Sequence, residues 1–313
     1  MVQFYKNINR ETLEIAQPEG ANWINVSPPF REEEMDRLSR ALNIDRDLLK
    51  DTLDIEERAR YEQEEGSKLI ILKTPVENKS LIASDAYFIT IPIAILITGR
   101  NQVITVNSFE NEAIRRFLGT FAKRHPERPN MMVLKIFEKV VFDFMEVLKE
   151  INHRRNVFEQ KLYASNRNEE LLALMRVQKS LVYFTTALRS NELLLKKMER
   201  TDFLHFDEEE RDYLADMIVE FSQALEMADN YSNILISTMD AFASIINNNM
   251  NIIIKRLTAI TIILTVPGLV ASFFGMNVHF PGENKTSGFY YALILSILFS
   301  VLMSVYFNKK KWF

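Results

Sequence analysis

The sequence of 313 residues contains no cysteine and has only eight glycines and nine prolines. Without cysteine the chain has no disulfide framework and no thiolate metal site, which fits a reducing compartment. The scattered glycines form neither G-x-x-x-x-G-K-[ST] nor G-x-G-x-x-G, so no nucleotide partner is expected. The four histidines form no H-E-x-x-H pair. These absences predict a protein that is not an enzyme.

A strong charge of one sign is also missing. The chain has 38 Lys and Arg against 42 Asp and Glu, for a net charge of −4. This balance produces no basic field to attract nucleic acid, so we expect no nucleic-acid partner. Acidic stretches at residues 54–65 and 207–210 are interpreted first as solvated surfaces, with cation binding as the weaker alternative.

Two long apolar runs stand near the C-terminus. Residues 257–274 and 289–307 contain no charged residue and no histidine. Each has about the length that an α-helix needs to cross roughly 30 Å of hydrocarbon. Lys255 and Arg256 precede the first run, three lysines at 309–311 follow the second, and the positive-inside rule therefore places both ends in the cytoplasm. The sequence predicts a two-span hairpin embedded in lipid of the plasma (inner) membrane, with cytoplasmic N- and C-termini.

The part before the hairpin has two kinds of pattern. The first third shows strand patterns and helical patterns that predict a small sheet with helices packed on it. The strand patterns lie at residues 22–26, 68–74, 84–98 and 102–106, and the helical patterns at 31–42 and 45–53. From residue 131 the chain is helical, with breaks predicted near 165–168 and 201–207.

The last helical stretch is the most regular. After residue 207, apolar residues recur at alternating steps of three and four, which is typical of a packed helical seam. Neither glycine nor proline occurs from residue 130 to residue 266. The pattern therefore predicts one helix of roughly 65 residues, about 100 Å long, that continues into the first span.

The sequence thus predicts an α/β N-terminal domain, a long helical stalk and a two-helix transmembrane hairpin. The predicted parts are a cytoplasmic α/β domain (1–130), a cytoplasmic helical region and stalk (131–256), a first transmembrane helix (257–274), an extracellular loop (275–288), a second transmembrane helix (289–307) and a basic cytoplasmic tail (308–313).

Small and polar residues recur along one face of the first span. They follow steps of three or four and are Thr258, Thr261, Thr265, Gly268 and Ser272. Such a stripe is either a packing seam between helices or the wall of a water-containing pore. Asn251 and the tripeptide at 275–277, at the two ends of the same helix, favour the pore.

The tripeptide Gly275-Met276-Asn277 ends the first of two spans, and the chain closes with three lysines, Trp312 and Phe313. This arrangement resembles the CorA family of magnesium transport proteins. Residues 23–26, Asp51 and residues 247–258 match the family pattern as well. The resemblance covers the whole chain.

The resemblance implies a homopentameric channel for passive uptake, in which five first-span helices line the pore. Gly275, Met276 and Asn277 would form the outer selectivity filter. The pore lining implied below it consists of Asn251, Ile254, Leu257, Thr261, Thr265, Gly268 and Ser272. Thr265 departs from relatives that carry a bulky apolar residue such as Met in the constriction, so the hydrophobic part of the gate is expected at Ile254 and Leu257.

The same resemblance implies that Asp51 and Asp240 hold regulatory Mg²⁺ between neighbouring subunits. Mg²⁺ would then be both the transported ion and the signal that closes the channel. Two alternatives stay open. One is a transporter of the same architecture for zinc or for several divalent cations, Co²⁺ and Ni²⁺ included. The other is a membrane-anchored sensor or scaffold, which would have no need for Gly-Met-Asn at the outer end of a span.

Overall fold

The computed structural model describes residues 2–8, 11–16, 20–28, 36, 39–40, 54–64, 66–79, 85–107, 114, 128–165, 168–276 and 287–312. The chain forms two compact units, Met1–Ile236 and Ser237–Phe313. The predicted helices at 31–42 and 45–53 lie outside the described residues, except that Asp36, Ser39 and Arg40 are helical.

A seven-stranded mixed sheet forms the base of the first unit. Its strands are β1 (Val2–Ile8), β2 (Glu11–Ile15), β3 (Trp23–Val26), β4 (Arg60–Glu64), β5 (Ser67–Glu77), β6 (Phe88–Ile97) and β7 (Val103–Asn107). Their order is β2-β1-β3-β7-β6-β5-β4, in which β3 and β7 pair in parallel and the other described neighbours are antiparallel. The predictions of β3, β5, β6 and β7 are confirmed to within a few residues, whereas β1, β2 and β4 were not predicted.

The middle of this sheet is the core of the unit. All residues of β6 and β7 are buried, because both strands lie inside the sheet and are covered by other parts of the chain. A short polar network connects the parallel pair within this core. Trp23 Nε1 donates to Thr105 Oγ1 at 3.0 Å, and Thr105 Oγ1 donates to Asn25 Oδ1 at 2.9 Å. Since these buried groups have partners, they keep the sheet's register without a large desolvation cost.

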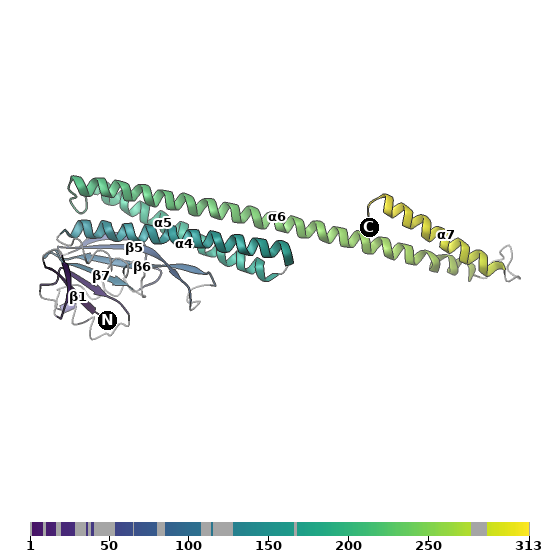
Figure 1. The fold of residues 1–313 in the computed structure, drawn as a ribbon, viewed down its shortest axis with the longest axis horizontal. Coiled ribbons are helices and arrows are strands. Elements are labelled where there is room, and N and C mark those ends of the chain that lie inside the picture. The colour runs from purple at the N-terminus through teal and green to yellow at the C-terminus, as the bar shows by residue number, and fades with distance from the viewer. Residues whose placement is uncertain are drawn as a thin grey trace. The chain divides into compact units, whose positions relative to one another are not determined.

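Two long helices, α4 (Pro129–Ser165) and α5 (Asn168–Thr201), cover one side of the sheet (Figure 1). They lie against β5 and β6. The ring of Phe184 on α5 packs against Phe88 of the sheet and, edge on, against Phe144 of α4, with ring centroids 6.2 and 5.3 Å apart. The breaks predicted near 165–168 and 201–207 are confirmed.

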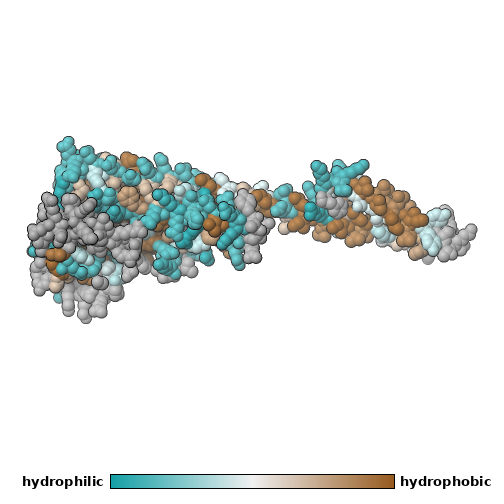
Figure 2. Space-filling model, in the orientation of Figure 1, coloured by the Kyte–Doolittle hydropathy of each residue, from teal (hydrophilic) through white to brown (hydrophobic). Residues whose placement is uncertain are grey.

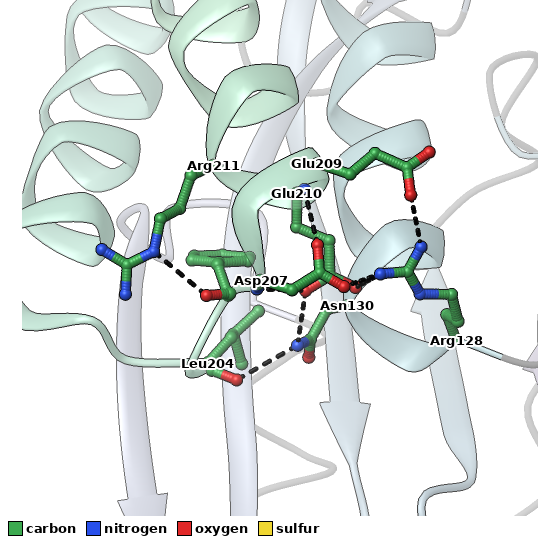
Figure 3. Close-up of polar contacts among 8 residues, drawn as sticks. Arg128, Asn130, Leu204, Asp207, Glu209, Glu210 and Arg211 are labelled. Atoms are coloured by element: carbon green, nitrogen blue, oxygen red, sulfur yellow. Dashed lines mark hydrogen bonds and ion pairs between the residues drawn. The ribbon is translucent and has the colours of Figure 1, made fainter.

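The next helix, α6 (Glu208–Phe274), begins with a capping box (Figure 3). Glu210 N donates to Asp207 Oδ1 at 2.9 Å, and Asp207 N donates to Glu210 Oε2 at 3.2 Å, so each residue satisfies the other's free backbone donor. Arg128 forms ion pairs with Asp207, with Glu209 at 2.7 Å and with Glu210 at 3.5 Å. Asn130 Nδ2 donates to Leu204 O and to Glu210 Oε2, at 3.1 and 3.2 Å.

This cluster corrects one interpretation of the sequence. The acidic stretch at 207–210 was interpreted as a solvated surface, which holds for the exposed residues 207–209 but not for Glu210, which has only 4 % of its surface exposed. Its carboxylate is held by Arg128 and Asn130 at the start of α4. The stretch therefore fixes the beginning of α6 against α4. The D-x-x-E spacing of Asp207 and Glu210 was the sequence signal of the capping box alone.

Helix α6 has 67 residues, which confirms the predicted single helix of roughly 65. Residues seven apart along the predicted seam are buried, namely Leu214, Phe221, Ala228, Leu235 and Phe242. The helix continues through Pro267. In the described part of the chain, α6 and α7 (Ser287–Lys309) are the two helices that are long and apolar enough to cross a membrane.

Candidate functional site

In the second unit, α6 and α7 lie side by side as a hairpin (Figure 1). Each helix has one narrow line of residues that are buried or half-buried. On α6 the line consists of Ala259, Ile263, Val266 and Val270, and on α7 of Ala292, Ser296, Ser300 and Phe307. The steps of three, four or seven residues put each line on a single helix face. The two lines therefore form the contact between the helices.

The α7 side of this contact is made mainly of small residues. Gly288, Ala292, Ser296 and Ser300 follow one another every four residues. Small side chains at this spacing let two helix backbones approach closely in a membrane. Ser296 Oγ donates to Ala292 O at 2.8 Å, so its hydroxyl hydrogen bond is satisfied within its own helix. This seam was not predicted, although the four-residue spacing of small residues is its signal in the sequence.

The predicted polar face of α6 points in another direction. Thr261, Thr265, Gly268 and Ser272 are all exposed in the single chain. At about 100° of rotation per residue, this face is centred roughly opposite to the line that contacts α7. The small and polar stripe is therefore not the packing seam of the hairpin.

The predicted pore lining continues on the same side of α6 toward its N-terminal end. Asn251 is exposed, and the side chains of Ile254 and Leu257 leave 52 % and 63 % of their surface uncovered. Exposed aliphatic side chains at this position need a cover of lipid or of other protein. All seven residues predicted to line a pore thus share one uncovered side of one helix.

The threonine hydroxyls on this side have a defined orientation. Thr261 Oγ1 donates to Leu257 O at 2.8 Å, and Thr265 Oγ1 donates to Thr261 O at 2.7 Å. Each hydroxyl has a single hydrogen, which is used in the helix, so the exposed oxygen offers only its acceptor capacity. The face is therefore a row of uncharged hydrogen-bond acceptors.

The C-terminal end of α6 carries the first two residues of the predicted filter. Gly275 N donates to Ala271 O at 2.9 Å, and Met276 N donates to Phe273 O at 3.3 Å, so the helix tightens as it ends. A Cβ added to Gly275 would lie 3.3 Å from Ala271 O, closer than most such contacts. Glycine therefore suits this tight end. Asn277, the third residue of the predicted filter, lies outside the described residues.

The two predicted regulatory carboxylates are placed differently. Asp240 is exposed on α6 and forms no ion pair or hydrogen bond with any described residue, and Asp51 lies outside the described residues. Within the described ranges, no group of three or more His, Asp or Glu residues could hold a metal ion. A site shared between subunits requires carboxylates from two chains, so the prediction for Asp51 and Asp240 stays a prediction.

Comparison with known proteins gives matches over nearly the whole chain. The family model described as "CorA-like Mg2+ transporter protein" matches residues 18–310. The cobalt/magnesium transport protein CorA of Methanocaldococcus jannaschii is 27 % identical over 296 residues, which cover 93 % of this chain and 90 % of that protein. The corresponding protein of Thermotoga maritima is 22 % identical and is matched over 83 % of its length, again with 93 % of this chain.

Solved structures agree with the sequence matches. The complete CorA magnesium transporter from M. jannaschii superposes with a TM-score of 0.87 at 25 % identity, with 100 % of this chain and 99 % of that chain covered. The predicted fold, with an α/β domain, a long helix and a C-terminal helix, is confirmed by this match. The cytoplasmic domain of ZntB from Vibrio parahaemolyticus has a TM-score of 0.61 at 13 % identity, over 79 % of this chain and 98 % of that one, which is a likeness of fold alone.

Proposed function

Because the chain belongs to the family of CorA-like Mg²⁺ transporter proteins, whose members are ion transporters and not enzymes, we propose that it forms a homopentameric channel for passive Mg²⁺ uptake. The observation that carries the proposal is the position of the polar face of α6, on the side away from α7. Co²⁺ is proposed as a second permeant ion, because the matched relatives from M. jannaschii and T. maritima are cobalt/magnesium transport proteins.

Closure into a ring follows from the membrane environment. The hydroxyl hydrogens of Thr261 and Thr265 are bonded within the helix, but the acceptor capacity of their exposed oxygens finds no partner in hydrocarbon, which contains no water. Copies of the hairpin arranged around a common axis would turn Thr261, Thr265 and Ser272 toward that axis and leave α7 on the outside. Such a closed symmetric ring covers the same face in every subunit. Five subunits are the number proposed from the family resemblance.

The chemistry of the face suits a hydrated ion. Mg²⁺ gives up its water reluctantly and usually keeps several waters when it binds. The hydrogens of these waters point outward, and the oxygens of Thr261 and Thr265 can accept them. Because this row of acceptors carries no charge, it would hold the ion weakly enough for the ion to leave, as conduction requires.

The two ends of the pathway have different roles. At the outer end, rings of Asn277 amides and of backbone carbonyls from Gly275 and Met276 would receive the hydrated ion. At the inner end, Asn251 would form a polar entrance, and rings of Ile254 and Leu257 would form the apolar constriction that closes the pathway. Hydrophobic constrictions of this kind gate channels by excluding water.

Uptake needs no nucleotide in this mechanism. With N- and C-termini in the cytoplasm, two positive charges that move inward across about 100 mV gain about 4.6 kcal/mol. This energy corresponds to a roughly 2,000-fold inward concentration bias. The membrane potential alone therefore supplies a sufficient driving force.

The experiment that tests the proposal measures Mg²⁺ entry into liposomes that contain the purified protein and a Mg²⁺-sensitive dye, under an inside-negative potential. We predict that Gly275→Ala and Asn277→Ala abolish uptake and leave the oligomer intact by light scattering. A methyl group on Gly275 would crowd Ala271 O, and Asn277→Ala removes the amide ring. Gly99→Ala is the matched control, because its Cβ would meet Gly66 O at an ordinary 3.6 Å. Normal uptake by an assembled Asn277→Ala protein would remove the filter assignment.

The second candidate is a transporter of the same architecture for zinc or for several divalent cations. The ZntB cytoplasmic domain shares the fold of this chain, which is a likeness of fold alone. Dyes for Zn²⁺, Co²⁺ and Ni²⁺ in the same liposomes distinguish the two candidates. Faster entry of Zn²⁺ than of Mg²⁺ would support the second, and absence of any flux would support a membrane-anchored scaffold.

A further inference from the structure

The C-terminal end of α7 is closed by a Schellman motif. Trp312 N donates to Phe307 O at 3.1 Å, and Lys311 N donates to Asn308 O at 3.0 Å. The rings of Phe307 and Trp312 pack together with centroids 5.1 Å apart. These two hydrogen bonds and this apolar contact are the features that define the motif. The basic residues predicted as a tail therefore belong to a built helix cap, in which Lys309 is still helical.

The residue in the left-handed position of this cap is a lysine. Lys311 has φ of 56°, in a place where glycine is usual because a side chain is disfavoured there. The end of α5 offers a comparison, since Asp202 (φ 47°) occupies the equivalent place in a second Schellman motif. Aspartate tolerates this conformation better, and Asp202 also pairs with Arg211 at 3.1 Å. Lys311 is exposed and has no hydrogen-bond or ion-pair partner for its side chain among the described residues.

Four more cations lie at the same end of the hairpin. Lys309 and Lys310 are exposed on the cap, and Lys255 and Arg256 are exposed on α6 shortly before Ala259. Figure 2 shows hydrophilic surface where α7 ends, next to the hydrophobic surface of the spans. We call these four residues, together with Lys311, the basic end of the hairpin.

The basic end has no acidic residue to neutralise it within the second unit. None of its five cations pairs with a carboxylate in the described part of the chain. Residues 237–313 contain only two acidic residues, Asp240 and Glu283, and Glu283 lies in the segment of the sequence between α6 and α7. Asp240 stands 15 residues before Lys255, which is about 22 Å along a helix. This separation exceeds the Debye length of about 8 Å at physiological ionic strength.

We propose that the basic end of the hairpin binds the phosphate groups of anionic phospholipids. Clusters of Lys and Arg directly beside a span are attracted to anionic headgroups. The aromatic rings of Tyr306 and Trp312, beside the same lysines, are of the kind that prefers the headgroup level. Glycine would fit the left-handed position of Lys311 better, but it would remove one cation from the basic end. This binding does not depend on which ion the protein transports.

The test uses the purified full chain in neutral detergent and counts bound lipids by native mass spectrometry, with phosphatidylglycerol and phosphatidylcholine of the same acyl chains. The wild-type protein should retain phosphatidylglycerol in preference to phosphatidylcholine. Lys311→Gly should weaken that binding about fivefold, the effect of one cation at a membrane surface. It should also keep or raise the unfolding temperature in lipid-free detergent, because glycine relieves the left-handed strain.

Two controls complete the experiment. Lys311→Arg should bind phosphatidylglycerol as wild type does, and Lys149→Gln should not change lipid binding, because Lys149 is an exposed lysine on α4 in the first unit. Equal retention of both lipids by wild type would overturn the proposal, and so would wild-type phosphatidylglycerol binding by Lys311→Gly. A lower unfolding temperature of lipid-free Lys311→Gly would show that Lys311 serves the cap itself. Full displacement of the lipid by inorganic phosphate at equal concentration would show a site for free phosphate instead.

Discussion

At the scale of single residues, Asn191 pairs with a part of the β5 backbone that no described strand accompanies. Strand β4 pairs with β5 over residues 67–71, so among the described residues no strand lies beside the backbone of Lys73 on that edge. The fully buried amide of Asn191 on α5 lies at this edge. Asn191 Nδ2 donates to Lys73 O at 2.7 Å, and Asn191 Oδ1 accepts from Lys73 N at 2.9 Å. This side chain thereby attaches α5 to the sheet.

We predict that Asn191→Leu lowers the free energy of unfolding by about 2–4 kcal/mol, because it leaves the half-buried N–H and C=O of Lys73 without these partners. Unfolding of the full chain in detergent, followed by near-ultraviolet circular dichroism, measures the loss. The neighbouring half-buried Ser190 serves as the control, and Ser190→Ala should change stability by less than about 0.5 kcal/mol. If Asn191→Leu is as stable as the control, water must form the hydrogen bonds to the backbone N–H and C=O of Lys73 in place of Asn191.

Residues in a contiguous motif and residues that contact a distant segment differ in how easily the sequence alone predicts them. The residues Gly275, Met276 and Asn277 are contiguous and follow an apolar run, so a filter could be predicted there from the sequence, and it stays a prediction. Asn191 contacts a backbone 118 positions earlier in the chain, and its side chain carries no local signal of that contact. The same reason hid the link between Arg128 and Glu210.

At the scale of elements, local periodicity predicted most of the helices and the interior strands. The spans are visible because an uncharged apolar run of this length is typical of a transmembrane helix. The strands that were missed lie at or next to the sheet edges, where one side stays open and polar residues are favoured. Strand β4, with the sequence RYEQE, is an example. The parallel pairing of β3 with β7 joins distant segments, so no local pattern could predict it.

The orientation of α6 leads to a test with introduced thiols, since the chain has no cysteine of its own. We predict that cysteines at Thr261, Thr265 and Ser272 react with a water-soluble thiol reagent in the membrane-embedded protein. Cysteines at Ile263 and Val270, on the line that contacts α7, should react at least about tenfold more slowly, because a thiolate forms poorly away from water.

Each cysteine variant should first be shown to assemble and to transport Mg²⁺, so that reactivity reports the native arrangement. Equal reaction rates on both faces of α6 would mean that water reaches the two faces equally. Faster reaction at Ile263 and Val270 would place the aqueous path on the opposite side of α6, against the proposed pore lining.

At the scale of the whole molecule, the proposed regulation depends on contacts between subunits. Carboxylates that are brought together across an interface repel each other until a divalent ion screens them. If Mg²⁺ bridges Asp240 of one subunit and Asp51 of the next, high internal Mg²⁺ would hold the pentamer closed. Loss of Mg²⁺ would loosen it, and uptake would resume. The exposed and unpaired carboxylate of Asp240 in the single chain is compatible with such a shared site.

This proposal predicts that Mg²⁺ protects the first unit against protease. A ligand present at ten times its dissociation constant, and bound only by the closed assembly, reduces the open population about tenfold. When opening is fast, cleavage should slow by the same factor. Asp240→Asn and Asp51→Asn should each reduce this protection and leave the channel more active at high internal Mg²⁺, because the filter is unchanged.

Glu226→Gln is the matched control, since it neutralises an exposed carboxylate on the same helix as Asp240. It should keep the Mg²⁺-dependent protection of wild type. The double variant of Asp51 and Asp240 should be less open than the two single variants imply, because neutralising both carboxylates also removes their repulsion, and groups in contact are not additive. If both single variants keep the Mg²⁺-dependent protection of wild type, Mg²⁺ must act at another site. The prediction for the pore would be unaffected, because it rests on the polar face of α6 and not on these carboxylates.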